Sequence, residues 1–354
     1  MKKCTYIPVR MIIGHCLPIH LFLVFFLTGM GTACGKASGS GATPLPLSPP
    51  VTDTSILPFK TGINAHHEIE WKRWAAWTGR PVDVVIVFPT RTDGWDGLTA
   101  DTWEFDNLSS FNGKMDFAIP LFPDGKGNLA DCAAGLYDQY WKQFGQLLVD
   151  HHRGNSYIRP AWEFNGNWFD GNKAADSALW IQAFRKVVTA IRSIAPEVRI
   201  EWVMNAHGSS VGCPPGQNAW SVYPGDDYVD IIGMDNYDMY PPSHNDEEWN
   251  AQCNDLHGLC HLVEQAKIHH KKFCVPEWGV SNKLPNGGGD SPYFISKMFD
   301  LFKANADILE YEAYFNDGAA DNVRSELYDL QNDKATVINP LAASQYLTLF
   351  GRKH

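Results

Sequence analysis

The sequence contains no run of lysine and arginine residues, and this excludes partners that require a concentrated positive charge. Its 354 residues include 29 Lys and Arg against 40 Asp and Glu, which gives a formal net charge of −11. A basic stretch is the usual means of holding a phosphate backbone or an anionic membrane surface. We therefore expect no nucleic-acid partner, and the acidic balance favours a neutral or cationic ligand.

Metal-binding patterns are also missing. The sequence has neither a CxxC pair nor an HExxH motif. Its adjacent histidines, at 66–67, 151–152 and 269–270, would diverge from one another on a strand or a helix and do not make a ligand set. We expect neither a metal ion nor a cofactor. No internal repeat is visible.

Aromatic residues, in contrast, are plentiful. The chain has 13 Trp and 13 Tyr, and flat aromatic faces are suited to stacking against the C–H faces of sugars. Most of these side chains are expected in the core, because large apolar rings are usually buried.

The first residues are typical of an export signal. Basic residues precede the apolar segment 17–27, LPIHLFLVFFL, which is short for a membrane span. The small residues 31–33 then stand directly before Cys34, as at a bacterial lipoprotein cleavage site. We predict a signal peptide over 1–34, with Cys34 as a lipidated membrane tether. The protein is then exported, and is either a cell-surface or outer-membrane lipoprotein, periplasmic, or secreted.

Residues 35–58 have the composition of a flexible linker. They read GKASGSGATPLPLSPPVTDTSILP, which is rich in Gly, Ser, Pro and Thr and has no apolar period. No comparable stretch interrupts residues 59–354, so we predict one catalytic domain over that range and expect a monomer.

Five of the eight cysteines fall in this domain and cannot all be paired. Cys253 and Cys260 are close together in a loop-rich stretch, and an exported domain meets oxidising conditions, so this pair is the best candidate for a disulfide. Cys274 lies inside an apolar strand and is expected to be a small buried residue.

Short apolar runs alternate with longer amphipathic stretches from residue 60 onward, which is typical of repeated βα units. We predict helices at 134–151, 174–194, 253–270, 292–305 and 340–350. Several strand candidates are nearly continuous apolar runs, as expected when both faces of a parallel sheet are buried. The number and order of the units predict an α/β fold, a (β/α)8 TIM barrel. The eight predicted strands are 60–65, 81–90, 115–122, 157–163, 199–205, 228–237, 272–279 and 308–316.

Two glutamates end apolar strands of this predicted barrel. Glu163 ends YIRPAWE, the fourth strand, and Glu277 stands near the end of KFCVPEWG, the seventh. Active sites of such barrels lie at the carboxyl ends of the strands. A carboxylate there is either paired structurally or exposed to a cleft. Glycoside cleavage requires two carboxyl groups in such positions, one protonated and one ionised.

Three segments carry a resemblance to a known family. Residues 159–169, RPAWEFNGNWF, resemble the acid/base motif of glycoside hydrolase family 26, the family of many β-mannanases. Residues 223–235, YPGDDYVDIIGMD, resemble its sixth-strand signature, and residues 276–279, PEWG, resemble its nucleophile strand. The resemblance implies a clan A hydrolase that retains anomeric configuration, with Glu163 as acid/base and Glu277 as nucleophile.

The sequence departs from the family pattern at two places beside Glu163. The family usually has His immediately before its acid/base glutamate, where this chain has Trp162. Asp170 and Gly171 stand where tryptophans often follow the matching Trp-Phe. The residue before the acid/base normally helps to bind the sugar, so these departures bear on the substrate.

Two residues are expected to act on the nucleophile. Arg159 would point inward and hold Glu277 ionised through its positive charge, whereas Glu163 must keep a raised pKa. Tyr237 matches a tyrosine that hydrogen-bonds the nucleophile in the family, with packing at the barrel rim as the alternative.

The remaining candidates are sugar contacts. Trp168 and Trp278 stand beside the two glutamates as possible platforms, although Trp278 could instead pack beneath the site. Asn205 and Asp235 end the fifth and sixth strands, and each could bind a sugar hydroxyl or satisfy loop backbone. His66 ends the first strand and could line the subsite of the cleaved sugar or be structural.

The sequence therefore predicts a retaining hydrolase of a β-linked polysaccharide, and an endo-β-1,4-mannanase in particular. Other β-glycans remain open as substrates, namely β-1,3-xylan, mixed-linkage glucan and exopolysaccharide. A non-catalytic surface lipoprotein that binds glycans is the rival from another class, because a fold alone does not establish activity.

Overall fold

The structure, a computed structural model, describes residues 56–207 and 210–352. The predicted signal peptide, Cys34 and most of the predicted linker lie outside the described residues. Eight parallel strands close into a barrel in sequence order, and this confirms the predicted (β/α)8 architecture. The strands are β1 Thr61–Asn64, β2 Val84–Val87, β3 Lys114–Ile119, β4 Tyr157–Pro160, β5 Arg199–Asn205, β6 Ile231–Tyr237, β7 Lys272–Gly279 and β8 Leu309–Tyr314.

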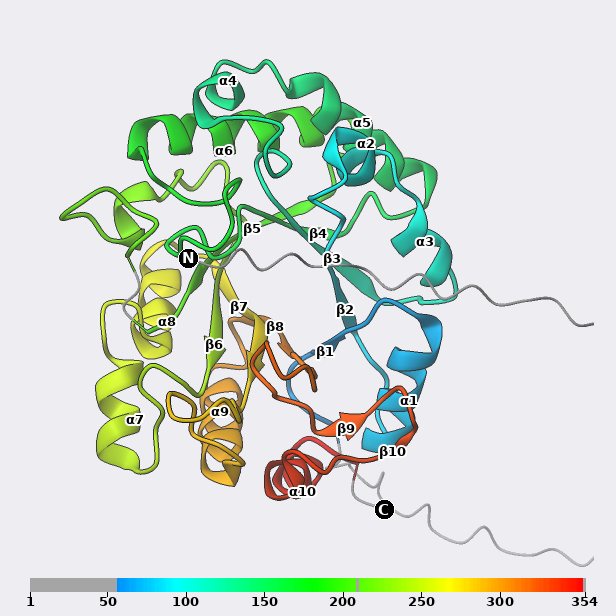
Figure 1. Ribbon diagram of the computed structural model, residues 1–354, viewed down its shortest axis with the longest axis vertical. Helices are drawn as coiled ribbons and strands as arrows, with labels where there is room; N and C mark the ends of the chain where they lie inside the picture. Colours follow the sequence, from blue (N-terminus) through cyan, green and yellow to red (C-terminus); the bar gives the residue numbers. More distant parts are fainter. Residues whose placement is uncertain (1–55, 208–209, 353–354) are drawn as a thin grey trace, which may run out of the picture. The chain divides into compact units, whose positions relative to one another are not determined.

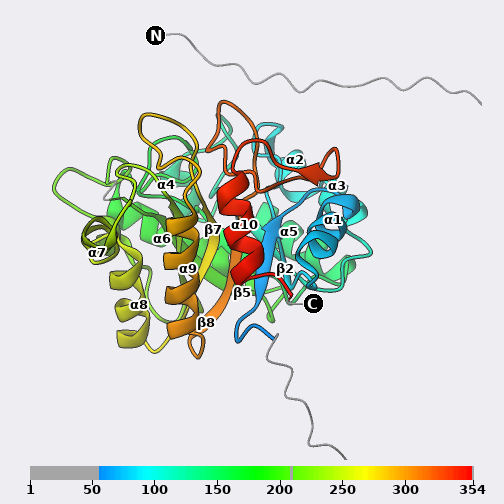
Figure 2. The ribbon, with the colours of Figure 1, turned by 90° about the horizontal axis from the view of Figure 1, so that it is seen from below.

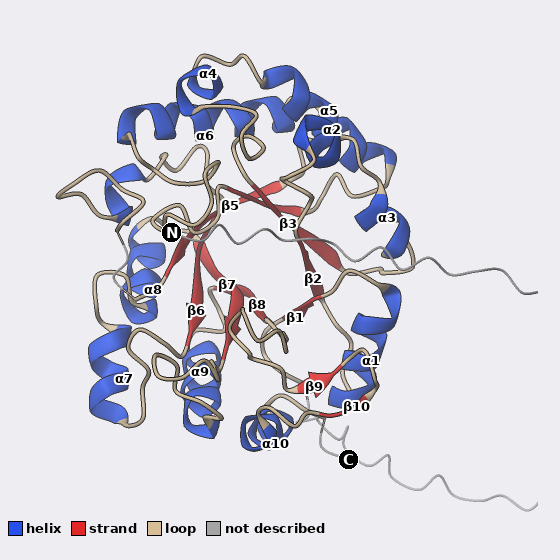
Figure 3. Cartoon of the chain, viewed as in Figure 1, coloured by secondary structure: helices blue, strands red, loops and turns tan. Residues whose placement is uncertain are grey.

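Helices form a ring outside the strands (Figures 1 and 3). They are α1 Glu68–Thr78, α2 Gly94–Thr99, α3 Trp103–Asn107, α4 Leu129–Ala133, α5 Asp138–Asp150, α6 Ser177–Arg192, α7 Asp246–Cys253, α8 Leu259–Ile268, α9 Pro292–Ala304 and α10 Pro340–Leu349, with a 3-10 turn at Ala219–Val222. A small antiparallel pair, β9 Tyr328–Asp329 and β10 Lys334–Ala335, lies at the end where the barrel strands finish (Figure 2). Within the described residues, no helix is long and apolar enough to cross a membrane.

Side-chain caps fix where the larger helices begin. Asp176 accepts a hydrogen bond from the Leu179 amide at the start of α6. Ser291 does the same for Phe294 at the start of α9, where Pro292 occupies the first turn. These contacts satisfy amide groups that have no partner inside the helix.

Alternation along each strand divides the core into two layers. On β2, Val84 and Ile86 belong to the cluster inside the barrel, whereas Val85 and Val87 belong to the cluster between strands and helices. Successive side chains of a strand point to opposite faces, so both layers together require the continuous apolar runs seen in the sequence. All four of these side chains are fully buried.

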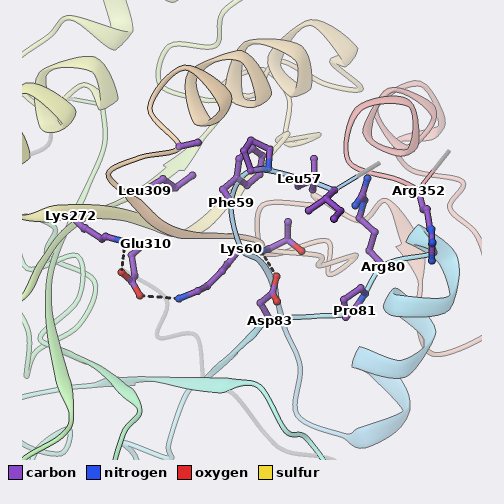
Figure 4. Close-up of a pocket in the computed structure, with 15 residues that line it drawn as sticks. Leu57, Phe59, Lys60, Arg80, Pro81, Asp83, Lys272, Leu309, Glu310 and Arg352 are labelled. Atoms are coloured by element: carbon purple, nitrogen blue, oxygen red, sulfur yellow. Dashed lines mark hydrogen bonds and ion pairs between the residues drawn. The ribbon is translucent and has the colours of Figure 1, made fainter. Parts of the chain in front are cut away.

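An ion-pair cluster closes the end of the barrel where the strands begin. Glu310, at the start of β8, contacts Lys60 Nζ at 3.1 Å, Arg199 Nη1 at 2.9 Å and Lys272 Nζ at 3.4 Å. Tyr157 OH donates to the same carboxylate at 2.6 Å. A cavity of about 570 Å³ adjoins this cluster (Figure 4). Because the mouth of such a barrel is at the other end of the strands, we treat the cluster as structural.

Several predicted boundaries differ from the structure, two of them beside Glu163 and beside the Cys253–Cys260 pair. The fourth strand ends at Pro160 rather than at residue 163. The helix predicted over 253–270 begins only at Leu259, and the preceding residues form a turn in which Asp255 accepts a hydrogen bond from the His257 amide. Local bonding by such a side chain competes with helix formation. Cys253 and Cys260 form the predicted disulfide across this turn, and Cys274 is buried as predicted.

Candidate active site

Glu163 and Glu277 lie at the same end of the barrel. Glu163 follows the end of β4 at Pro160, and Glu277 is third from the end of β7. Since all eight strands are parallel, the ends of β4 and β7 share the mouth at which barrel enzymes carry their catalytic residues.

The backbone around Glu163 leaves strand geometry in order to present its carboxylate. Ala161 has φ of +53° and Glu163 has φ of +54°, values that non-glycine residues seldom adopt. The Ala161 amide donates to Ile119 O at 2.7 Å and the Glu163 amide donates to Val203 O at 3.0 Å. Bonds to the neighbouring strands therefore hold an unfavourable conformation, as is common at functional sites.

Glu277 has a polar, cationic environment. Its Oε1 accepts a hydrogen bond from Arg159 Nη1 at 2.9 Å, and its Oε2 accepts one from Tyr237 OH at 3.0 Å. Arg159 and Tyr237 thus both contact Glu277, and the roles that the sequence predicts for the three residues remain predictions.

Glu163 has the opposite environment. Burial and then the charge of Glu277 raise its pKa to about 7, although hydrogen bonds from Asn205 and Trp168 act in the other direction. Asn205 Nδ2 donates to Oε1 at 2.7 Å, and Trp168 Nε1 donates to Oε2 at 2.7 Å. The effect of Glu277 on this pKa places the two carboxyl groups within electrostatic reach. Glu163 is therefore suited to carry a proton near neutral pH, as one of the two carboxyl groups in glycoside cleavage must.

The backbone of Asn205 is itself held in place by the Asn165 side chain. Asn165 Nδ2 donates to Asn205 O at 2.8 Å, and Asn165 Oδ1 accepts from the Asn205 backbone amide at 2.8 Å. Asn165 was not among the residues predicted for the site. Its signal in the sequence is its position two residues after Glu163 within the family-like motif.

Buried acids extend from Arg159 into the barrel, and sequence reasoning missed them. Arg159 Nε lies 2.7 Å from Asp116 Oδ2. Tyr311 OH lies 3.0 Å from both Asp116 Oδ2 and Glu201 Oε2. A tyrosine has a single proton to donate, so one of these contacts requires a proton on the carboxyl group. Burial, followed by the charge of Asp116, raises the pKa of Glu201 well above its usual value, so Glu201 is suited to carry that proton.

Asp235 lies beside Arg159 and does not reach the protein surface. Its carboxylate is 3.4 Å from Arg159 Nη1, and it is fully buried. Burial, then the charge of Glu277, raises its pKa well above its usual value. The sequence offered a sugar hydroxyl or loop backbone as the partner of the Asp235 side chain. In the structure its carboxylate contacts Arg159 instead.

Trp162 is almost entirely covered. It is 3% exposed, and its ring packs 4.8 Å from Phe169 and 6.0 Å from Phe88. Asn172 fixes its backbone through a hydrogen bond to Trp162 O at 2.7 Å. Trp162 therefore forms part of the wall of the site, where histidine is usual in the family.

Of the other predicted sugar contacts, Trp168 and His66 are accessible to solvent and Trp278 is buried. Trp168 is 46% exposed at the mouth beside Glu163. His66 stands after β1, with Nδ1 at 3.2 Å from Glu104 Oε1. Trp278 is fully buried, and its indole donates to Glu312 and packs on Phe302 of α9. Trp278 therefore packs beneath the site, which is the alternative that the sequence left open for it. Successive side chains of a strand point to opposite faces, so its position directly after Glu277 indicated this.

No group of His, Cys, Asp and Glu within residues 56–207 and 210–352 has the arrangement of a metal site.

Comparisons with known proteins agree with this geometry. The family model for glycosyl hydrolase family 26 matches residues 145–275, which include Glu163 and end just before Glu277. Endoglucanase H of Acetivibrio thermocellus is 24% identical over 257 residues, covering 71% of this chain and 24% of that protein. A mannan endo-1,4-beta-mannosidase of Bifidobacterium adolescentis is 24% identical over 212 residues, covering 57% and 20%. The chain thus spans about a quarter of the length of these relatives, or less.

Solved structures show the same fold. The catalytic domain of a family 26 endo-β-1,4-mannanase from Bacillus sp. JAMB-750 superposes with a TM-score of 0.60 at 15% identity, covering 81% of this chain and 85% of that one. A modular endo-β-1,4-mannanase from Cellulomonas fimi gives a TM-score of 0.55 at 18% identity, covering 78% and 65%.

The closed barrel carries two glutamates at its mouth, and this architecture is the one predicted from the sequence. The chain is similar to glycosyl hydrolase family 26 over residues 145–275, and family 26 mannanases share its fold.

Proposed function

We propose that this protein hydrolyses a β-linked polysaccharide with retention of configuration and that its substrate is β-1,4-mannan, cleaved within the chain. The observation that carries the proposal is the contrast between the two carboxyl groups. Glu163 is half-buried and its pKa is raised to about 7, whereas Glu277 accepts hydrogen bonds from Arg159 and Tyr237. A pure binding protein has no need for this difference.

The proposed reaction is a double displacement. Glu277 attacks the anomeric carbon and forms an ester bond, the glycosidic C–O bond breaks, and the Glu163 proton passes to the leaving oxygen. Glu163, now ionised, takes a proton from water, whose oxygen attacks the same carbon and breaks the ester bond. Both carboxyl groups return to their starting states. Asn205 and Trp168 hold the Glu163 carboxylate throughout, through one hydrogen bond to each of its oxygens.

The choice of mannan is supported by the names of similar proteins. Two structural neighbours and one sequence relative are described as endo-β-1,4-mannanases or a mannan endo-1,4-beta-mannosidase. The relative named Endoglucanase H favours a second candidate, a mixed-linkage or other β-glucan. Trp162 bears on the choice because it replaces the usual histidine at the wall of the site.

We also propose that the protein acts outside the cell, tethered through Cys34. The support is the basic start of the chain, the apolar segment 17–27 and the small residues 31–33 before Cys34. Metabolic labelling with a palmitate analogue, with Cys34→Ser as control, tests this. Label in the variant would contradict it.

A reducing-sugar assay over mannan, xylan, mixed-linkage glucan and β-1,3-xylan tests the substrate. Proton NMR of the first product then tests retention, since a retaining enzyme releases the β-anomer first. We expect the highest rate on mannan. An α-anomer as first product would contradict the double displacement, and binding of mannan without turnover would favour the non-catalytic alternative.

A further inference from the structure

A second cavity lies beside the catalytic residues, between the ends of β1 and β2 and the short helices α2 and α3. It measures about 190 Å³. Sites for drug-sized ligands are typically about 300–1,000 Å³, so this cavity suits something smaller, such as a single sugar ring. The residues that matter for its chemistry are His66, Phe88, Asp101, Trp103 and Glu104, all of which line it.

Phe88 connects this cavity to the catalytic centre. The ring, at the end of β2, is half-buried and lines the cavity. On another side its centroid is 5.7 Å from the Arg159 guanidinium carbon, and Arg159 in turn holds Glu277. The ring also lies 6.0 Å from Trp162. The cavity and the nucleophile therefore share one wall.

Trp103 gives the cavity an exposed aromatic face. It is 43% exposed, although it begins α3 and packs against His66 and His67 at ring distances of 5.9 and 5.2 Å. An indole that is steadied on one side and open on the other is suited to stack against the C–H face of a sugar.

Glu104 and His66 supply polar groups at the inner end. The Glu104 carboxylate is 7% exposed and lies 3.2 Å from His66 Nδ1. The His66 side chain is 38% exposed, and its Nε2 forms no hydrogen bond with the described part of the chain. A carboxylate and an imidazole can accept from and donate to sugar hydroxyls. The two acids, Asp101 and Glu104, disfavour a negatively charged sugar.

We propose that this cavity is a distal subsite that binds one neutral pyranose ring on the glycone side of the cleaved bond. The inference rests on the proposed glycosidase function. The leaving chain lies by Glu163, which protonates its oxygen, and by the exposed Trp168 that donates to Glu163. The chain attached to Glu277 extends the other way, along Phe88 toward Trp103. Trp103 is then a specificity-determining residue for substrates longer than one sugar.

The test compares Trp103→Ala with the wild type on two substrates. One is β-1,4-mannopentaose, and the other is 2,4-dinitrophenyl β-mannoside, whose single sugar cannot reach the cavity. We expect kcat/KM for mannopentaose to fall about tenfold further than kcat/KM for the aryl mannoside, a common size for loss of an aromatic contact. Trp103→Phe, which keeps an aromatic ring, should recover most of the activity on mannopentaose that Trp103→Ala loses. Ile268→Ala is the control, because it truncates an exposed side chain at the far end of the barrel. It should change kcat/KM on neither substrate.

Cleavage in heavy-oxygen water locates the subsite, because the label marks the new reducing end. Trp103→Ala should lose the binding mode that leaves the longest fragment on the glycone side. Equal losses on both substrates, or loss of the opposite mode, would overturn the proposal.

Direct binding separates this inference from the proposed function. If the wild type cleaves no substrate, the proposed function fails, and calorimetry with mannopentaose still tests the cavity. Binding that is about tenfold weaker in Trp103→Ala would support the subsite. Equal affinity in a variant with unchanged melting temperature would overturn it.

Discussion

Arg159 and Glu277 face one another inside the barrel mouth, joined by a hydrogen bond of 2.9 Å from Nη1 to Oε1. Arg159 is fully covered and Glu277 is 6% exposed. Burial alone would lower the pKa of Arg159, but the charges of Asp116, Asp235 and Glu277 raise it well above its usual value. A permanent cation therefore stands beside the carboxylate for which we propose the nucleophilic role.

Replacement of the nucleophile should abolish turnover. We expect Glu277→Ala to lose more than about a hundredfold in kcat while it still binds oligosaccharide, because a covalent catalyst is removed. Azide should restore cleavage of an activated aryl β-glycoside with inversion, since a small anion can attack from the vacated face. Glu163→Ala with azide should instead give a product of retained configuration. The anomeric configuration of the two glycosyl azides, determined by proton NMR, distinguishes the roles of the two glutamates. The same anomer from both variants would contradict the assignment.

The pH dependence of activity should report the proton on Glu163. Its pKa is raised to about 7 by burial and then by the charge of Glu277, and the general acid must be protonated in the first step. The rate kcat/KM should therefore be full below pH 7 and fall as pH rises through that value. The decline should be missing in Glu163→Ala assayed on a 2,4-dinitrophenyl glycoside with azide. A midpoint near the ordinary glutamate value in the wild type would refute this origin.

Substitution of Trp162 should change the choice of substrate. We expect Trp162→His to raise the ratio of the rate on mannan to the rate on mixed-linkage glucan, because imidazole is the group that the family usually presents there. The smaller ring leaves space against Phe169 and Phe88, so the melting temperature should also fall by several degrees. Rates on both glycans and calorimetric melting are the measurements. A lower melting temperature with an unchanged ratio would make Trp162 a packing residue only.

Glu310 should contribute to stability at neutral pH and lose that contribution in acid. Although burial alone would raise its pKa, Tyr157 and Arg199 lead the contacts that lower it to about 2, from an ordinary value of 4.5. A depressed pKa means that folding favours the ionised form, so the stabilisation is present above about pH 4.5 and is lost as pH falls toward 2. We expect Glu310→Gln to reduce the free energy of unfolding by roughly 1.5–3 kcal/mol at pH 6.

Urea unfolding at pH 6 and at pH 3 measures this effect, and the difference between Glu310→Gln and the wild type should narrow at the lower pH. Glu264→Gln is the control, because Glu264 is 64% exposed and pairs with Lys267 on the same helix. Surface pairs of this kind contribute little. A difference that is constant with pH would show that the Glu310 charge is not its source.

The two glutamates could be predicted from the sequence because each follows an apolar strand, and the ends of parallel strands meet at one edge. Asn205 followed from the same rule, whereas Trp168 followed from its place beside Glu163 in the segment 159–169. Asp116 and Glu201 did not, because each stands inside an apolar strand, in KMDFAI and RIEWVMN. A charge in such a strand indicates a buried partner, but only the closed barrel shows that Asp116 meets Arg159 and that Glu201 meets Tyr311.

Strand ends were less predictable than strand centres. Residues 199–205 and 272–279 coincide with β5 and β7, since their apolar runs stop where the strands do. The fourth strand was extended to Glu163, although Ala161 and Glu163 adopt positive φ. Hydrogen bonds from neighbouring strands impose that conformation, and local propensity gives no sign of it.

The described chain enters the barrel at the face formed by Leu57, Phe59 and Lys60, next to the Glu310 cluster (Figure 4). The mouth with Glu163 and Glu277 is at the opposite end of the strands. Any segment that precedes Ile56 is therefore attached at the back of the enzyme. The point of attachment and the pair Glu163 and Glu277 therefore lie at opposite ends of the strands, so a tether at Ile56 does not occupy the mouth where a polymer would bind.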